Sequence, residues 1–219
     1  MPRAFTHTWF FFGDSLTLGV NDNRMPGGWV SRLVLLGQEA GLYRFPPATF
    51  YNLGARRQST ADLARRWRQE VDCRQMPGMV PHLVFCAGVV DMAAPGGGQP
   101  VALDKAMYCL RTMLTEAAPL APTLVISPPP VADPTVRRRI AELSAAQAVL
   151  CAELGLPFAD IHAALAASHS YMDDLSDGLH PGPEGCTVMA ETLLTQNTVR
   201  DFLHADIGCL LYTSPSPRD

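Results

Sequence analysis

The chain has 219 residues, of which 47% are hydrophobic and 17% are charged, and its formal net charge is −4. This composition is typical of a globular protein with a sizeable core and excludes a largely disordered chain. The slight excess of acidic residues provides no basic face for nucleic acid, so we expect no nucleic-acid partner.

Short apolar runs alternate along the chain with longer segments of helical period. In chain order they predict a strand at 9–12, a helix at 29–39, a strand at 50–53, a helix at 60–73, a strand at 82–87, a helix at 101–117, a strand at 123–126, a helix at 135–154, a strand at 157–160, one or two helical turns at 161–167, a polar loop at 168–182 and a helix at 183–203. Strands that alternate with helices favour right-handed crossovers and a parallel sheet that is covered on both faces. We therefore predict a three-layer α/β/α sandwich of the flavodoxin-like type, with about five parallel strands in the order 2-1-3-4-5.

One domain is expected over residues 1–208, because the length suits a single α/β domain and no linker divides it. Residues 209–219 have no helical or strand period and end in a Pro-Ser-Pro run. They resemble the translation of a sequencing adapter, so we predict that they are a non-native tail.

The six cysteines are scattered and include no CxxC pair. This pattern favours reduced thiols in a cytoplasmic protein and gives no metal site. No apolar stretch approaches the ~20 residues of a membrane span, and the first residues lack the features of a signal peptide. We expect a protein without an integral membrane segment.

Polar or glycine-containing segments follow several of the predicted strands. They are residues 13–16, residue 54, residues 88–91 and residues 177–180. In an open parallel sheet, ligands bind beyond the carboxyl ends of the strands, near the switch in strand order. The segments at 54 and 88 would lie on either side of Ser15, which makes this edge of the sheet the candidate active site.

These segments resemble the conserved blocks of the SGNH/GDSL hydrolase family of esterases, lipases and thioesterases. FGDSLT at 12–17 matches the first block, NLG at 52–54 the second and DGLHP at 177–181 the last, and GVVD at 88–91 lies where the third block, Gly-x-Asn-Asp, belongs. The set occurs in the order of the family over nearly the whole predicted domain. The resemblance implies an α/β serine esterase that needs no cofactor.

Ser15, His180 and Asp177 are the candidate catalytic residues. A serine at the start of a helix is more often a cap, and a lone Asp-x-x-His is more often a surface turn. However, a serine hydroxyl needs an adjacent base to become a nucleophile, and a histidine can take and return a proton near neutral pH. Asp177 can fold back within one turn to accept the Nδ1–H of His180, which fixes the tautomer that faces Ser15. Asp173 and Asp174 are too far along the chain from His180 for this tight turn.

The oxyanion hole departs from the family pattern. The resemblance implies three donors: the N–H groups of Ser15 and Gly54, and the side chain of the third-block asparagine. Val90 occupies the asparagine position and cannot donate a hydrogen bond. The loss of one such donor lowers the rate of a well-studied protease by roughly 10²–10³. Three interpretations remain open: a slowed esterase, an esterase with a substitute donor, and a catalytically weakened binding protein.

Other residues near these segments have less definite roles. Asp14 resembles a residue that braces the nucleophile turn in the family, and Ser127 is a candidate substitute donor. A basic stretch follows the second strand, at Arg56, Arg57, Arg65, Arg66 and Arg68. We interpret it mainly as a solvated face, although Arg56 or Arg57 could reach the cleft mouth and favour an anionic substrate.

The predicted function is hydrolysis of a carboxylic ester through an acyl-enzyme on Ser15. Candidate substrates are short acyl or acetyl esters, lysophospholipids and thioesters, because the family covers all of these classes. The alternative is an SGNH-fold binding protein that retains the cleft but has lost activity through Val90.

Overall fold

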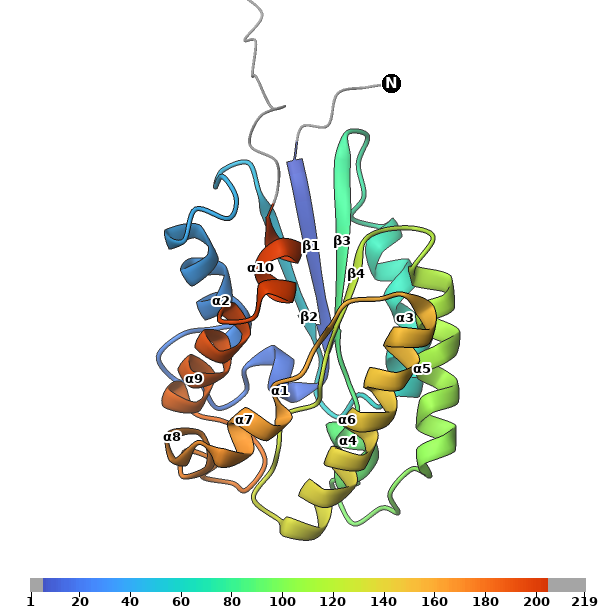
Figure 1. Cartoon of the computed structure of the whole chain (residues 1–219), viewed down its shortest axis with the longest axis vertical. Coiled ribbons are helices and arrows are strands. Elements are labelled where there is room, and N and C mark those ends of the chain that lie inside the picture. The colour runs from blue at the N-terminus through green and yellow to red at the C-terminus, as the bar shows by residue number, and fades with distance from the viewer. Residues whose placement is uncertain (1–5, 205–219) are drawn as a thin grey trace, which may run out of the picture.

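The structure is a computed structural model, and it describes residues 6–204 (Figure 1). Its centre is a five-stranded, entirely parallel sheet with the strand order β2-β1-β3-β4-β5. The strands are β1 (Thr6–Gly13), β2 (Thr49–Gly54), β3 (Met79–Cys86), β4 (Thr123–Ile126) and β5 (Phe158–Ala159). The predicted fold class and strand order are therefore confirmed.

Helices cover both faces of the sheet and form the outer two layers (Figure 1). Those in the described part of the chain are α1 (Ser15–Leu18), α2 (Gly28–Glu39), α3 (Thr60–Asp72), α4 (Val89–Ala93), α5 (Leu103–Ala117), α6 (Pro134–Leu154), α7 (His162–Ala167), α8 (His169–Met172), α9 (Pro183–Leu194) and α10 (Asn197–Leu203). Helices α2, α9 and α10 lie on one face, and α3, α5 and α6 lie on the other. The two short helices α1 and α4 lie instead at the carboxyl edge of the sheet.

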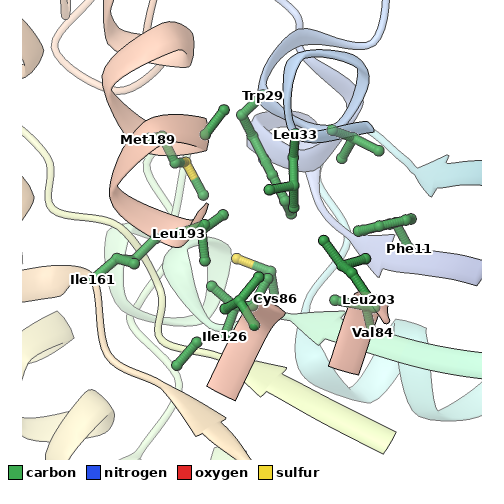
Figure 2. Close-up of a cluster of buried hydrophobic side chains, with 14 of the residues drawn as sticks. Phe11, Trp29, Leu33, Val84, Cys86, Ile126, Ile161, Met189, Leu193 and Leu203 are labelled. Carbon is green, nitrogen blue, oxygen red and sulfur yellow. The ribbon is translucent and has the colours of Figure 1, made fainter. Parts of the chain in front are cut away.

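Strand β1 runs through the middle of the core, and its side chains alternate between the two faces. Trp9 and Phe11 pack into the cluster formed with α2 and α9, whereas Phe10 and Phe12 pack into the cluster formed with α3 and α5. All four are at most 1% exposed. Figure 2 shows Phe11 in the first cluster, with side chains from several other elements. A continuous apolar run is what a strand buried on both faces requires.

The structure differs from the predicted elements mainly at short helices. The sequence did not predict α4, α8 or the extent of α1, because segments of four or five residues are too short to show a helical period. The long helix predicted at 183–203 is two helices, α9 and α10. They are separated at Gln196, whose backbone is extended and whose side chain donates to the carbonyl of Asp160. This tertiary contact interrupts a pattern that is otherwise helical.

Two predictions about the ends of the chain lie outside residues 6–204. The domain limit at 208 and the tail at 209–219 fall beyond the described residues. Within residues 6–204, no helix has both the length and the apolar character needed to cross a membrane. The cysteines of this part of the chain are free thiols: Cys73, Cys86, Cys109, Cys151 and Cys186.

Candidate active site

Ser15 lies in the sharp turn that joins β1 to α1. A Cβ atom on Gly13 would lie 2.0 Å from Oγ1 of Thr17, so the turn leaves room only for glycine. Asp14 is the N-cap of α1, and its carboxylate accepts a hydrogen bond from the N–H of Leu16 at 2.9 Å. Ser15 is the first helical residue, and its own N–H donates to no other described residue. The turn therefore presents a hydroxyl and a free N–H of the same residue.

His180 joins the first and last predicted segments of the site. Its Nε2 lies 2.7 Å from Oγ of Ser15, and its Nδ1 lies 2.7 Å from a carboxylate oxygen of Asp177. The structure thus brings these three side chains into one hydrogen-bonded chain, from a carboxylate through an imidazole to a hydroxyl. Such a chain can move a proton from the hydroxyl to Nε2 while the carboxylate holds the ring in place.

Asp177 is held as an anion by the backbone of its own turn. The carboxylate oxygen that does not contact the imidazole accepts the N–H groups of Leu179 at 2.9 Å and His180 at 2.7 Å. Partial burial acts to raise the pKa of Asp177, but the hydrogen bonds from His180 and Leu179 outweigh it and lower the pKa to about 2. Asp177 therefore remains charged at neutral pH.

The loop that carries His180 is fastened to its neighbours at several points. The N–H of Ala132, in the loop before α6, donates to the carbonyl of Gly178 at 2.9 Å. Asp174 accepts the N–H of Gly185 at 2.6 Å through its carboxylate, and its carbonyl accepts the N–H of Gly182 at 3.3 Å. Asp174 forms no hydrogen bond with His180, as expected, but it anchors the loop to α9. Nothing in the sequence pattern indicated this contact.

The backbone and side-chain donors differ from the oxyanion hole that the family resemblance implies. The N–H of Gly54 donates to the side-chain oxygen of Asn52 at 3.0 Å, so it is already occupied. The amide nitrogen of Asn52 donates in turn to the carbonyl of Thr17 at 2.8 Å, which ties the end of β2 to α1. Val90 lies in the first turn of α4, partly exposed, and its side chain has no donor. Among the expected donors, the Ser15 N–H is the one left free.

Ser127 is not placed to replace the missing asparagine. It is fully buried at the end of β4, and its hydroxyl oxygen accepts the N–H groups of Ile161 at 2.8 Å and His162 at 3.2 Å. Its hydroxyl therefore stabilises the chain after β5.

The turn between β2 and α3 carries two arginines. Arg56 and Arg57 are exposed, and neither their side chains nor their backbone N–H groups bond to another described residue. Arg57 has φ 60°, in the left-handed region. This conformation costs a residue other than glycine about 1 kcal/mol or more, and such strain is often found at functional sites.

Arg66 departs from the predicted solvated face. Its guanidinium is half-buried and donates to the carbonyl of Leu53 at 2.7 Å and to the side-chain oxygen of Gln58 at 2.9 Å. Arg66 thereby holds the end of β2 and the turn beside the site. Arg65 and Arg68 agree with the prediction, because they pair with Asp62 and Asp72 at the surface.

Two buried carboxylates lie beneath the site. Burial raises the pKa of Asp14 to about 6, although hydrogen bonds from the backbone of Leu16 and the charge of His180 act to lower it. Asp91, in α4, accepts both the N–H and the hydroxyl of Thr60 at 2.9 Å. This pair of bonds joins α4 to the first residue of α3.

Residues 6–204 hold no group of three or more His, Cys, Asp or Glu side chains that could bind a metal ion.

Comparisons with known proteins point in the same direction as the geometry. The model of the GDSL-like Lipase/Acylhydrolase family matches residues 11–188. No curated protein shows significant sequence similarity to the chain.

Several solved structures share the fold. The acetylxylan esterase Axe2 from Geobacillus stearothermophilus aligns over 88% of this chain and 93% of its own, with 19% identity and a TM-score of 0.70. LAE5, an alpha/beta hydrolase from the metagenome of Lake Arreo in Spain, aligns over 90% of this chain and 96% of its own, with 20% identity and a TM-score of 0.68. At this level of identity, both structures show a common fold and no more.

Proposed function

The chain belongs to the GDSL-like lipase/acylhydrolase family and is a serine hydrolase that acts on esters, and from this premise we propose that Ser15 is its nucleophile. The observation that carries the proposal is the hydrogen-bonded chain from Asp177 through His180 to Ser15, with both heavy-atom distances at 2.7 Å. Structures of Axe2 include catalytic mutants in which a serine, an aspartate or a histidine is replaced by alanine. The mutated aspartate of Axe2 precedes its histidine by three residues, as Asp177 precedes His180 here.

In the proposed reaction, His180 takes the proton of Ser15 as the hydroxyl oxygen attacks the ester carbonyl. His180 then gives this proton to the departing alcohol, which leaves the acyl group on Ser15. A water molecule deprotonated by His180 hydrolyses the acyl-enzyme and restores the serine. Asp177 keeps the imidazole oriented and stabilises its charge while it holds the proton.

The tetrahedral intermediate needs donors for its negative oxygen. We assign one of them to the free N–H of Ser15. This N–H belongs to the same residue as the attacking hydroxyl, so it lies close to the attacked carbon. Gly54 could contribute only if its N–H left Asn52. We therefore place the second donor in the turn that follows, at Arg56 or Arg57, whose backbone N–H groups are free among the described residues.

The proposed substrate is a short acyl ester, with an acetyl ester as the first to test. This choice follows the fold shared with Axe2, which is an acetylxylan esterase. A binding protein without activity would have no need for the three aligned side chains, so that alternative gains no support from the site.

The test is the hydrolysis of para-nitrophenyl acetate by the wild type and by matched variants. Ser15→Ala and His180→Ala should each remove most of the activity, and Asp177→Asn should lower kcat by at least about 10²-fold, because asparagine favours the wrong tautomer. The double variant of Ser15 and His180 should be little worse than either single variant.

Exposed residues of the same region supply the controls. Ser176→Ala, His169→Ala and Asp173→Asn change the same residue types without touching the hydrogen-bonded chain, and they should retain activity. A fluorophosphonate probe should label the wild type on Ser15, as read by mass spectrometry of the peptide. Wild-type rates in Ser15→Ala would refute the assignment.

A further inference from the structure

The turn between β2 and α3 holds positive charge that the protein does not neutralise. The side chains of Arg56 and Arg57 are exposed and pair with no described residue. The next four arginines in the chain are each paired with Asp or Glu: Arg65, Arg66, Arg68 and Arg74. The nearest acidic side chain in sequence, Asp62, is already bound to Ser59 and Arg65. In a chain with net charge −4, these two cations are therefore a local exception.

This turn lies directly beside the nucleophile. Gly13 pairs with Gly54 in the sheet, and the N–H of Ala55 donates to the carbonyl of Gly13 at 3.1 Å. A Cβ atom on Gly54 would lie 2.3 Å from the nitrogen of Leu18, so the turn starts in contact with α1. Three residues of chain span at most about 11 Å. Both arginines thus begin within reach of the space in front of Ser15.

The turn is also held firmly at both ends. Asn52 fixes Gly54 on the side of β2, and Asp91 fixes Thr60 at the start of α3. Between them, Arg66 holds the side chain of Gln58. The backbone of a braced turn loses little conformational freedom when a ligand binds, so the entropic cost of binding is confined mainly to the arginine side chains.

The backbone of Arg57 adds an independent observation. Its φ of 60° would be free of strain for glycine, yet arginine occupies the position. Stability alone therefore does not account for this side chain, and an observed strain of this kind points to a function.

We propose that Arg56 and Arg57 bind an anionic group of the substrate, so that the preferred ester carries a carboxylate or a similar oxyanion close to the scissile bond. A guanidinium binds a carboxylate through paired, charge-assisted hydrogen bonds, which a neutral amide of the same shape cannot reproduce. This inference rests on the proposed function, because it concerns the substrate of the same site.

The test uses two pairs of esters that differ only in charge. In the first pair the charge is on the alcohol side: meta-carboxyphenyl acetate and meta-carbamoylphenyl acetate. In the second it is on the acyl side: the para-nitrophenyl monoester of glutaric acid and the matching ester of its monoamide. The measured quantity is the ratio of kcat/KM for the anionic ester to kcat/KM for its neutral partner.

We expect this ratio to fall by roughly ten-fold in the Arg56→Gln/Arg57→Gln double variant for at least one pair, which corresponds to about 1.4 kcal/mol. Arg65→Gln is the matched control, because Arg65 is exposed on α3 but paired with Asp62, and its ratio should equal that of the wild type. Added salt should lower the wild-type ratio, since it screens exposed charges. Arg57→Gly should lower the ratio while its Tm stays equal to or above that of the wild type, because the variant relieves the strain.

Equal ratios in the wild type and the double variant for both pairs would overturn this inference while leaving the esterase proposal intact. Failure of the wild type to hydrolyse any of the four esters would count against both proposals. The two failures are therefore distinguishable in one set of measurements.

Discussion

The buried carboxylate of Asp14 yields a quantitative prediction about stability. Asp14 is 2% exposed, and burial raises its pKa from 3.8 to about 6. The folded protein therefore holds this proton more tightly than the unfolded chain, so the free energy of unfolding decreases as the pH rises from about 4 to about 6. A shift of about two units corresponds to a penalty on the order of 3 kcal/mol at neutral pH.

Asp14→Asn should remove this penalty, because asparagine is also a good N-cap but carries no charge. Urea unfolding at about pH 8 should show a larger free energy of unfolding for Asp14→Asn than for the wild type, and the difference should shrink towards about pH 4. Asp133→Asn is the matched control, since Asp133 caps α6 from an exposed position and its variant should show no such gain. The reasoning fails if the wild type and Asp14→Asn have the same dependence on pH.

The same variant should be a slower enzyme. The negative charge of Asp14 acts on His180, so it favours the imidazolium that forms while the proton is in transit. A variant that is more stable but less active would indicate that the protein keeps this buried charge for the reaction. Esterase kcat, measured on the same preparations, supplies this second readout.

Two further predictions concern Val90 and His82. Val90→Asn should raise kcat by roughly ten-fold on para-nitrophenyl acetate, with little change in KM, because the amide of asparagine would donate to charge that develops only in the transition state. Val90→Asp is the control: aspartate has the shape of asparagine but lacks the N–H donor, so it should bring no gain. Burial and the neighbouring His7 lower the pKa of His82 from 6.5 to about 4, so acidification through this range should reduce stability, by up to about 3 kcal/mol. Urea unfolding should show that His82→Phe loses less stability than the wild type between about pH 7 and pH 4. An equal loss in both proteins would show that His82 is not the cause.

The sequence alone predicted the strands because they are short, apolar and bounded by glycine or proline, and the predicted order 2-1-3-4-5 is the one typical of a flavodoxin-like fold. The residues of the hydrogen-bonded chain were also predicted, since Ser15 and Asp177–His180 occupy segments that a parallel sheet brings to one edge. In both cases the relevant signal is local in sequence.

The contacts that the sequence did not reveal are those that depend on tertiary packing. Arg66 belongs to a basic run typical of a solvated face, and its turn towards the end of β2 has no local signature. The bond from Gly54 to Asn52 is similar: the motif matched, but the direction of one N–H depends on how the strand end packs on α1. Short helices such as α4 were missed because they lack a measurable period.

The hydrogen bond between Ser15 and His180 joins residues 165 positions apart in the chain. Ser15 lies near the start of the described part of the chain, and His180 lies just before α9, which packs against α2. Closing so long a loop is slow and needs most of the intervening structure to be in place. Recovery of esterase turnover during refolding should therefore lag behind recovery of helix content measured by circular dichroism. Activity would report that the whole fold is complete, whereas circular dichroism would report only that its helices have formed.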